Sequence, residues 1–472
     1  MKLQNLATAI AALATSNVLA EEAKMDRLMQ LKEQTWSRAR AEGVFGGSKL
    51  YKKITSFRPC INGVSGLRGE DQYKCSNVDM HGFLSHEDLG SKSMVGNDVW
   101  GWVSPSGREF GIVGQTDGVG FVEVNKLTGS LDYIGRLDTQ TPNQIVSWRD
   151  MKVIDNHVYI GAESNNHGLQ IFDLRKLEQV KGRLNPFWKP KVFSTTSDVK
   201  LFTGFGASHN IVADTDRKII YAAGGRSGPN SRNTPCAGGL FIVDVKDPNN
   251  PTSPGCTGQD GYVHDAQCVV YKGPTQKYQG KNICFNFNED TLTVMDMTNL
   301  TSPVVVSKTP YVGNQYTHQG WLANSEMTML LLDDELDELD GVGPSAGNGR
   351  SVTYLFNIAN LEKPVNTGFY QSPEGVKSID HNLYVKDNLA YHANYGSGLR
   401  VRDVSSVSRD MTGGGVVERG FFDCHPEDDA EGGAVEFLGT WSTYPYFPSG
   451  YILLNSIERG IFSLKYTGRR AG

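Results

Sequence analysis

A unit of three β-rich segments recurs in this chain from about residue 100 to the C-terminus. Each copy opens with a short polar and aromatic signature, and most copies end in a hydrophobic–Asp–hydrophobic step. The openings lie roughly 48 to 63 residues apart, which is the period of propeller blades rather than of helical repeats. They are VWGWV at Trp100, SWRDMKV at Trp148, SHNIV at His209, VHDAQCV at His264, THQGWL at His318, DHNLYV at His381 and GTWS at Trp441. The repeat predicts an all-β, seven-bladed β-propeller.

The N-terminus has the pattern of a secretory signal. Residues 1–20 begin with a positive charge at Lys2, continue through an apolar stretch and place small residues at Val18 and Ala20, which indicates cleavage after Ala20. A buried N-terminal helix is the alternative. Residues 21–44 then favour a helix with a partial apolar face, and we expect this helix either to dock on the propeller or to be trimmed.

The segment before the first repeat is expected to close the ring. NVDMHGFLS (77–85) is typical of a strand and would pair with IFSLKY, the last strand of the final repeat, which removes the edge that an open ring leaves. The chain therefore divides into a helical, disulfide-stapled extension at 21–59, a propeller at 60–466 and a tail at 467–472.

Composition argues against nucleic-acid partners and against a membrane-spanning segment. The net charge is −6 and the chain has no long basic run, so nucleic-acid binding is not expected. After the signal, no stretch approaches the roughly 20 apolar residues that span a membrane. We expect a monomer outside the cell, either free or associated with the cell wall.

Seven cysteines in a secreted chain predict three disulfides and one free thiol. Spacing alone does not fix the connectivity, but it favours three pairs, with Cys424 left over. These pairs are Cys60 with Cys75, Cys236 with Cys256, and Cys268 with Cys284. Asn299 begins an Asn-Leu-Thr acceptor for N-glycosylation, which indicates a surface turn.

Strand direction predicts a polar funnel at one mouth of the axis. Adjacent strands of a blade are antiparallel, so the start of the first strand and the end of the second lie on the same face. The polar side chains expected around this mouth, as candidate ligand-binding residues, are Arg149, Asp150, Glu163, Asn210, Asp265, Glu289, Gln319, Glu335, Asn382 and Asn394.

Four consecutive blades bring histidines toward the same axis: His209, His264, His318 and His381. Neutral imidazoles that converge on one point are ligands for first-row transition metals, and nearby carboxylates fix their tautomers. Hydrogen bonding between blades is a second role for these side chains. A metal-free catalytic or sugar-binding role is a third.

An acidic run, DDELDELD at 333–340, lies in a long insertion between two strands. Carboxylate oxygens of this kind bind calcium, but the run lacks the spacing of the twelve-residue calcium loop. A solvated acidic insertion at the funnel mouth is the favoured interpretation.

The motifs resemble those of the extracellular LVIVD-repeat proteins of the choice-of-anchor B type. LFIVDV (240–245) matches the repeat name most closely, and SWRDMKV, THQGWL, DDELDE and DHNLYV are similar to that family's longer motifs. The likeness runs from about Cys60 to Leu464. It implies a secreted β-propeller and no established reaction.

We therefore expect a secreted binding protein that presents the axial funnel to an extracellular protein or glycan. The chain has no GxSxG elbow, HExxH motif, P-loop or dinucleotide fingerprint. The alternative is a metalloenzyme, oxygenase-like or lyase- or hydrolase-like, that holds a divalent metal ion in the four-histidine ring. Glu163, Glu289 and Glu335 are then candidate bases. A structural protein of the cell wall is a third interpretation.

Overall fold

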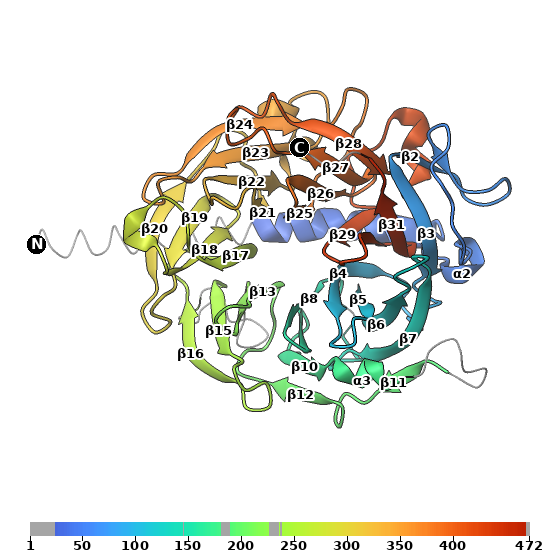
Figure 1. The fold of residues 1–472 in the computed structure, drawn as a ribbon, viewed down its shortest axis with the longest axis horizontal. Coiled ribbons are helices and arrows are strands. Elements are labelled where there is room, and N and C mark those ends of the chain that lie inside the picture. Colours follow the sequence, from blue (N-terminus) through green and yellow to red (C-terminus); the bar gives the residue numbers. More distant parts are fainter. Residues whose placement is uncertain (1–23, 145, 181–188, 226–235, 237, 469–472) are drawn as a thin grey trace, which may run out of the picture.

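Seven antiparallel sheets surround a common centre in the computed structural model (Figure 1), which describes residues 24–144, 146–180, 189–225, 236 and 238–468. The first strands of neighbouring blades contact one another around the ring, and β4 contacts both β8 and β29. The seven-bladed propeller is thereby confirmed. The expected signal at 1–20 lies outside the described residues.

The strands of each blade are named here in order from the axis to the rim. They are β4 (Gly96–Val103), β5 (Glu109–Gln115), β6 (Gly118–Val124) and β7 (Leu131–Asp138), to which β11 (Lys191–Phe193) adds; β8 (Arg149–Ile154), β9 (His157–Ala162), β10 (Leu169–Asp173) and β12 (Val199–Phe202); β13 (Asn210–Asp214), β14 (Ile219–Ala223), β15 (Leu240–Asp244) and β16 (Thr252–Thr257); β17 (Asp265–Val270), β18 (Asn282–Phe287), β19 (Leu292–Asp296) and β20 (Val304–Thr309); β21 (Thr317–Leu322), β22 (Met329–Asp334), β23 (Val352–Asn357) and β24 (Val365–Gln371); β25 (Asn382–Lys386), β26 (Leu389–Asn394), β27 (Gly398–Asp403) and β28 (Val417–Phe422), extended by β2 (Tyr73–Ser76) and β1 (Val64–Ser65); and β29 (Thr440–Tyr444), β30 (Tyr451–Ser456), β31 (Gly460–Tyr466) and β3 (Val78–Ser85).

Each blade thus has a fourth strand where the sequence predicted three. The fourth strand of the last blade is β3, which pairs antiparallel with β31 from Val78 opposite Tyr466 to Ser85 opposite Gly460. The ring therefore closes through the N-terminal segment, as the sequence predicted. The clusters of buried apolar side chains lie between adjacent blades, where Phe83, Phe422 and Phe462 pack together.

The disulfide bonds hold loops and neighbouring strands together. They link Cys60 to Cys75, Cys236 to Cys256 and Cys268 to Cys284, and Cys424 is a buried free thiol. The Cys268–Cys284 bond joins directly opposed residues of β17 and β18. These bonds are the ones that the cysteine spacing favoured.

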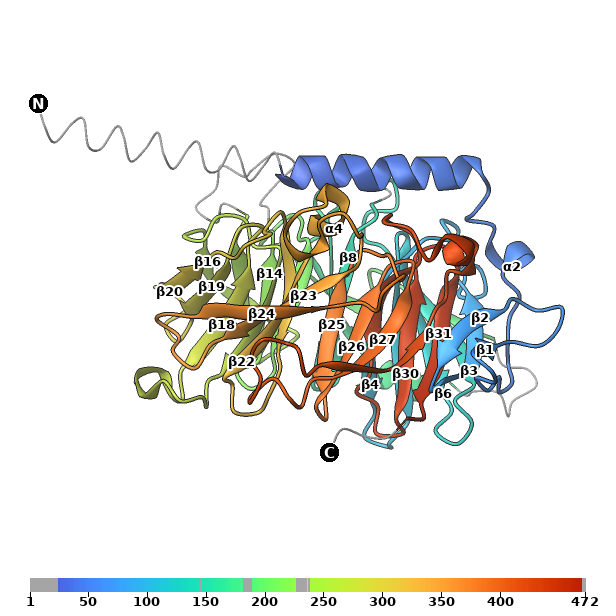
Figure 2. The same cartoon turned by 90° about the horizontal axis from the view of Figure 1, so that it is seen from above.

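Helical structure is short apart from one segment. A helix over residues 24–41, called the capping helix below, lies flat along one face of the disc (Figure 2). The shorter helices are α2 (Gly47–Leu50), α3 (Arg175–Glu178) and α4 (Asp337–Asp340), with single 3₁₀ turns at Gln276–Tyr278, Gly343–Ser345 and Pro426–Glu431. Within the described ranges, none of the helices has the length and apolar character that crossing a membrane requires.

Candidate functional site at the propeller axis

The capping helix covers the mouth at which the polar funnel was expected. Its apolar face carries Met25, Leu28, Trp36 and Ala39, all buried against the starts of the inner strands and the loops around them. The indole Nε1 of Trp36 donates a hydrogen bond of 2.8 Å to the carbonyl oxygen of Phe437. The expectation of an open, water-filled funnel at this mouth is therefore wrong, because the helix buries the polar side chains beneath it.

Under the helix, the four histidines lie side by side along an arc. Their ring centroids are 4.2 Å apart from His209 to His264, 4.2 Å from His264 to His318 and 4.4 Å from His318 to His381. Each imidazole is at most 2% exposed. They come together because His318 lies in β21 and the other three directly precede β13, β17 and β25, at equivalent places in four consecutive blades.

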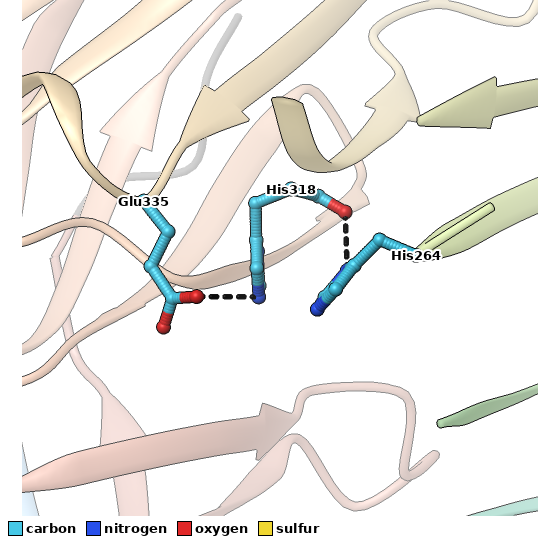
Figure 3. Close-up of side chains that lie close together, drawn as sticks. All are labelled: His264, His318 and Glu335. Carbon is cyan, nitrogen blue, oxygen red and sulfur yellow. Dashed lines mark hydrogen bonds and ion pairs between the residues drawn. The ribbon is translucent and has the colours of Figure 1, made fainter. Parts of the chain in front are cut away.

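Hydrogen bonds fix the tautomers of this cluster. The Nδ1–H of His264 donates to the carbonyl oxygen of His318 at 2.7 Å (Figure 3), and that of His381 donates to the carbonyl oxygen of Trp441. A carbonyl oxygen only accepts, so Nε2 keeps its lone pair in both rings. Nδ1 of His209 lies 3.0 Å from Oε1 of Glu163, the carboxylate contact that orients metal-bound histidines. Burial lowers the pKa of His264, His318 and His381, which keeps these rings neutral.

Glu335 lies at the centre of this arrangement. Nε2 of His318 is 3.7 Å from Oε2 of Glu335 (Figure 3), and Nε2 of His381 is 3.5 Å from Oε1. The hydroxyl of Tyr395 donates a hydrogen bond to Oε1. The carboxylate is buried, which makes a nearby positive charge necessary.

Lys32 of the capping helix supplies that charge. Its Nζ is 2.6 Å from Oε1 of Glu335, and the side chain is fully buried. Aromatic rings surround the ammonium at 5.3 to 6.0 Å from their centroids, which favours a cation electrostatically: those of Trp148, Tyr395, Phe437 and Trp441. Burial lowers the pKa of Lys32, and the carboxylates of Glu335 and Glu163 counteract the shift.

Sequence reasoning missed Lys32, although its position carried a signal. Met25, Leu28, Lys32, Trp36 and Ala39 recur at intervals of three or four residues, which defines one face of a helix. A lysine on the apolar face of a helix needs a buried partner, and the acidic funnel was the obvious one.

The amide side chains that follow the histidines hold neighbouring blades together. Nδ2 of Asn210 donates to the carbonyl oxygen of His264 at 3.0 Å, and Nδ2 of Asn382 donates to that of Trp441 at 3.3 Å. Gln319 both donates to and accepts from the backbone of Leu383. Hydrogen bonding between blades, one of the alternatives for the histidines, thus describes these residues, and His264 and His381 also bond to the next blade through Nδ1.

Other expected funnel residues have structural partners or lie in a separate layer. Arg149 donates to the carbonyl oxygen of Gln115, Asn394 donates to Ser351, and the backbone of Glu289 pairs with that of Thr317. Four buried charged residues form a separate layer along the channel: Asp98, Asp150, Lys152 and Asp265. In that layer Nζ of Lys152 is 2.6 Å from Oδ1 of Asp150, and burial raises the pKa of Asp265 to about 7.

The channel is open at the opposite face, toward which the inner strands run. A pocket of about 660 Å³ is lined by the later residues of these strands and by Asp265, Lys152 and Gln267. Its aromatic residues are Trp100, Trp102, Trp321, Tyr384, Tyr444 and Tyr446. The lining includes Ile211, two residues after His209, and Asp265, the residue after His264. A ligand in this pocket therefore approaches the axis from the face that the helix does not cover.

No family model matches this chain, and no curated protein matches it. The likeness to the LVIVD-repeat proteins accordingly rests on the sequence motifs alone. The structure establishes a disulfide-bonded, seven-bladed β-propeller whose axial histidines lie under an N-terminal helix.

Proposed function

We propose that the axial cluster is a transition-metal centre and that the protein is a metal-dependent β-propeller. The observation that carries the proposal is the fixed tautomer of His264 and His381, which leaves a lone pair on Nε2 of each ring; Nε2 of His381 lies 3.5 Å from Oε1 of Glu335. Ligand atoms of His264, His318 and Glu335 all lie within 4.8 Å of one another. Imidazole with one carboxylate is a donor set that suits iron, cobalt and zinc.

The spacing of the rings supports histidine ligation. Imidazoles bound at right angles to one ion at about 2.1 Å place their centroids roughly 4.5 Å apart. The neighbouring centroids here are 4.2 to 4.4 Å apart, and ligand atoms of His264 and His318 lie within 4.8 Å of one another and of Glu335, so we propose these two as ligands and His209 and His381 as further ligands that side-chain rotation would bring in. A metal ion in such a site polarises a substrate or activates water, and Glu163 and Glu335 are the carboxylates nearest to it.

The capping helix regulates this centre in the proposed scheme. The ammonium of Lys32 and a metal dication compete for the carboxylate of Glu335, because both need it as the buried counter-charge. Metal therefore binds when the helix lifts from the mouth, and the helix closes the mouth when metal is absent.

Metal uptake by the full chain tests the proposal. In equilibrium dialysis against zinc or cobalt, we expect the wild-type protein to saturate at about one equivalent. The double variant His264→Ala/His318→Ala should bind less than about a tenth of that, because it loses two of the aligned Nε2 donors. His157→Ala removes a histidine at the start of β9 and serves as the matched control. Equal uptake by all three proteins would overturn the assignment.

The aromatic pocket favours a second candidate function, binding of an extracellular glycan. Trp321 and Tyr384 meet edge to face at 5.1 Å between centroids, and Trp100 and Tyr384 do so at 5.4 Å, which forms a rigid aromatic wall beside polar groups. Rigid aromatic faces with a few polar groups are typical of ligand pockets. On a glycan array, Trp321→Ala should lose any binding that the wild-type protein shows, while Trp36→Phe at the opposite face should retain it. Binding that survives Trp321→Ala would exclude this pocket.

Secretion is part of the same proposal. Three disulfides are consistent with an oxidising compartment, and Asn299 is exposed in a turn where a glycan could be attached. We propose an extracellular monomer, free or associated with the cell wall.

A further inference from the structure

We propose that Asp333, Asp337, Glu338 and Asp380 form a buried calcium site between the fifth and sixth blades. Asp333 is the penultimate residue of β22, Asp337 and Glu338 belong to α4, and Asp380 lies two residues before β25. The site is separate from the axial centre and does not depend on the function proposed for it.

The acidic run turns inward in the folded chain. Asp333 and Asp337 are fully buried, Glu338 is 4% exposed, and Asp380 from the next blade is fully buried beside them. The interpretation of 333–340 as a solvated insertion is therefore wrong. Ligand oxygens of Asp337, Glu338 and Asp380 lie within 4.8 Å of one another, and ligand atoms of Asp333, Asp380 and His392 form a second group of the same size that shares Asp380. Two oxygens on opposite sides of a calcium ion are at most about 5 Å apart, so the group of Asp337, Glu338 and Asp380 has the right size, with Asp333 beside it.

Two of the four carboxylates are each held through one oxygen. Tyr354 donates its hydroxyl to Oδ2 of Asp337 at 2.7 Å, and the backbone N–H of Val352 donates to Oε1 of Glu338 at 2.8 Å. The remaining oxygens, Oδ1 of Asp337 and Oε2 of Glu338, are buried and have no hydrogen-bond partner in the described part of the chain. Oδ1 of Asp380 is also buried and has no hydrogen-bond partner among the described residues. In metal-binding carboxylates, a hydrogen bond to one oxygen commonly orients the group while the other oxygen binds the metal.

Asp333 is the strongest indication of a missing cation. Neither of its carboxylate oxygens has a hydrogen-bond partner among the residues that the structure describes, and the side chain is completely buried. Its closest polar neighbour is Nε2 of His392, at 3.3 Å from Oδ1. A buried carboxylate in this condition is strongly destabilising without a counter-charge.

His392 does not belong to the ligand set. Nη1 of Arg402 lies 3.2 Å from Nδ1 of His392 and donates to it, because a guanidinium only donates. The proton of the neutral ring is then on Nε2, which lies 3.3 Å from Oδ1 of Asp333 without forming a hydrogen bond of acceptable geometry. The ligands that remain are all oxygens, which selects a hard cation.

Charge and enclosure favour calcium over magnesium. Arg402 is a cation that acts on Asp333 and Asp380, but burial and the neighbouring carboxylates raise the pKa of all four groups, so a dication would stabilise their ionised forms. Magnesium binds few protein ligands and keeps several of its waters, whereas calcium accepts a cage of carboxylates. The bound ion would fix the insertion that connects β22 to β23.

Calcium removal from the full-length protein tests the site. We expect about one calcium per chain after purification, and chelation should lower the midpoint of thermal unfolding by about 5–10 °C, with recovery on adding calcium but not magnesium. Terbium(III) should bind in place of calcium and show luminescence sensitised by Tyr354, which touches Asp337. No calcium in the protein, no terbium signal and an unchanged midpoint would overturn the proposal.

Substitutions separate this site from the axial one. Asp337→Asn and Glu338→Gln preserve shape and should abolish the terbium signal, while Asp340→Asn, on the same helix but paired with Arg27 at the surface, should retain it. The variant His264→Ala/His318→Ala should also retain it. If that variant loses the signal while Glu338→Gln keeps it, terbium occupies the axial centre and the assignment fails.

Discussion

Lys32→Met is expected to increase the affinity of the full chain for zinc by at least about 100-fold, because it removes the repulsion between the Lys32 ammonium and the metal ion. Two positive unit charges about 4 Å apart repel by roughly 4 kcal/mol at an effective dielectric constant of 20. The wild-type ammonium is 2.6 Å from the carboxylate that the metal needs, and it has no exposed surface through which water could screen it. Methionine keeps the length and the apolar contacts of the side chain in its aromatic surroundings. Isothermal titration with zinc measures the change.

A matched substitution on the same helix controls for net charge. Lys24→Met removes the same charge, but Lys24 pairs with Asp290 at a half-exposed position. We expect less than about a twofold change in zinc affinity for that variant, since exposed charges are screened by solvent and salt. If Lys32→Met binds zinc no better than Lys24→Met, the helix does not compete with metal.

Arg459→Met should destabilise the fold by about 1.5–3 kcal/mol, because it removes the charge-assisted hydrogen bonds of a buried guanidinium to two partly exposed carboxylates, Asp71 and Glu427. Arg459 is 2% exposed at the turn between β30 and β31, and it reaches the disulfide-bonded N-terminal loop. Its Nη1 is 3.1 Å from Oδ2 of Asp71, its Nη2 pairs with Glu427, and its guanidinium carbon lies 4.5 Å from the ring centroid of Tyr51. One side chain therefore connects the closing blade to segments on both sides of it.

Arg419→Met provides the comparison for this prediction. Arg419 also forms an ion pair, at 2.8 Å from Asp403, but its side chain is 46% exposed. Exposed pairs contribute about 0–1 kcal/mol, so urea unfolding should separate the two variants clearly. Similar losses of stability in both would show that the Arg459 cluster does not hold the ring closed.

The blade repeat could be predicted because its strongest signals lie in buried strands. Inner and middle strands such as Met329–Asp334 are buried throughout, so their apolar runs are long and regular. The fourth strands escaped prediction because they lie at the rim: Val304–Thr309 and Val365–Gln371 are largely exposed and follow proline-containing turns. Such segments have the composition of linkers, and only pairing with the third strand makes them strands.

The histidine cluster could be predicted for a topological reason. Equivalent positions in successive blades must meet at the axis, whatever the sequence between them. An amphipathic helix that docks on the propeller could also be predicted, but its place over the cluster could not, because no local pattern shows that residues 24–41 pack over residues about 300 positions later. The acidic run misled for the same reason. Its burial depends on Asp380 from another blade, and a run of charges is by composition alone a surface feature.

X-ray absorption at the metal edge of zinc-loaded Lys32→Met protein shows whether the axial histidines are metal ligands. We expect nitrogen ligands at about 2.0–2.1 Å with the multiple-scattering pattern of imidazole, and loss of that pattern when His264 and His318 are also replaced by alanine. A spectrum with oxygen ligands only, or one that the double substitution leaves unchanged, would contradict histidine ligation.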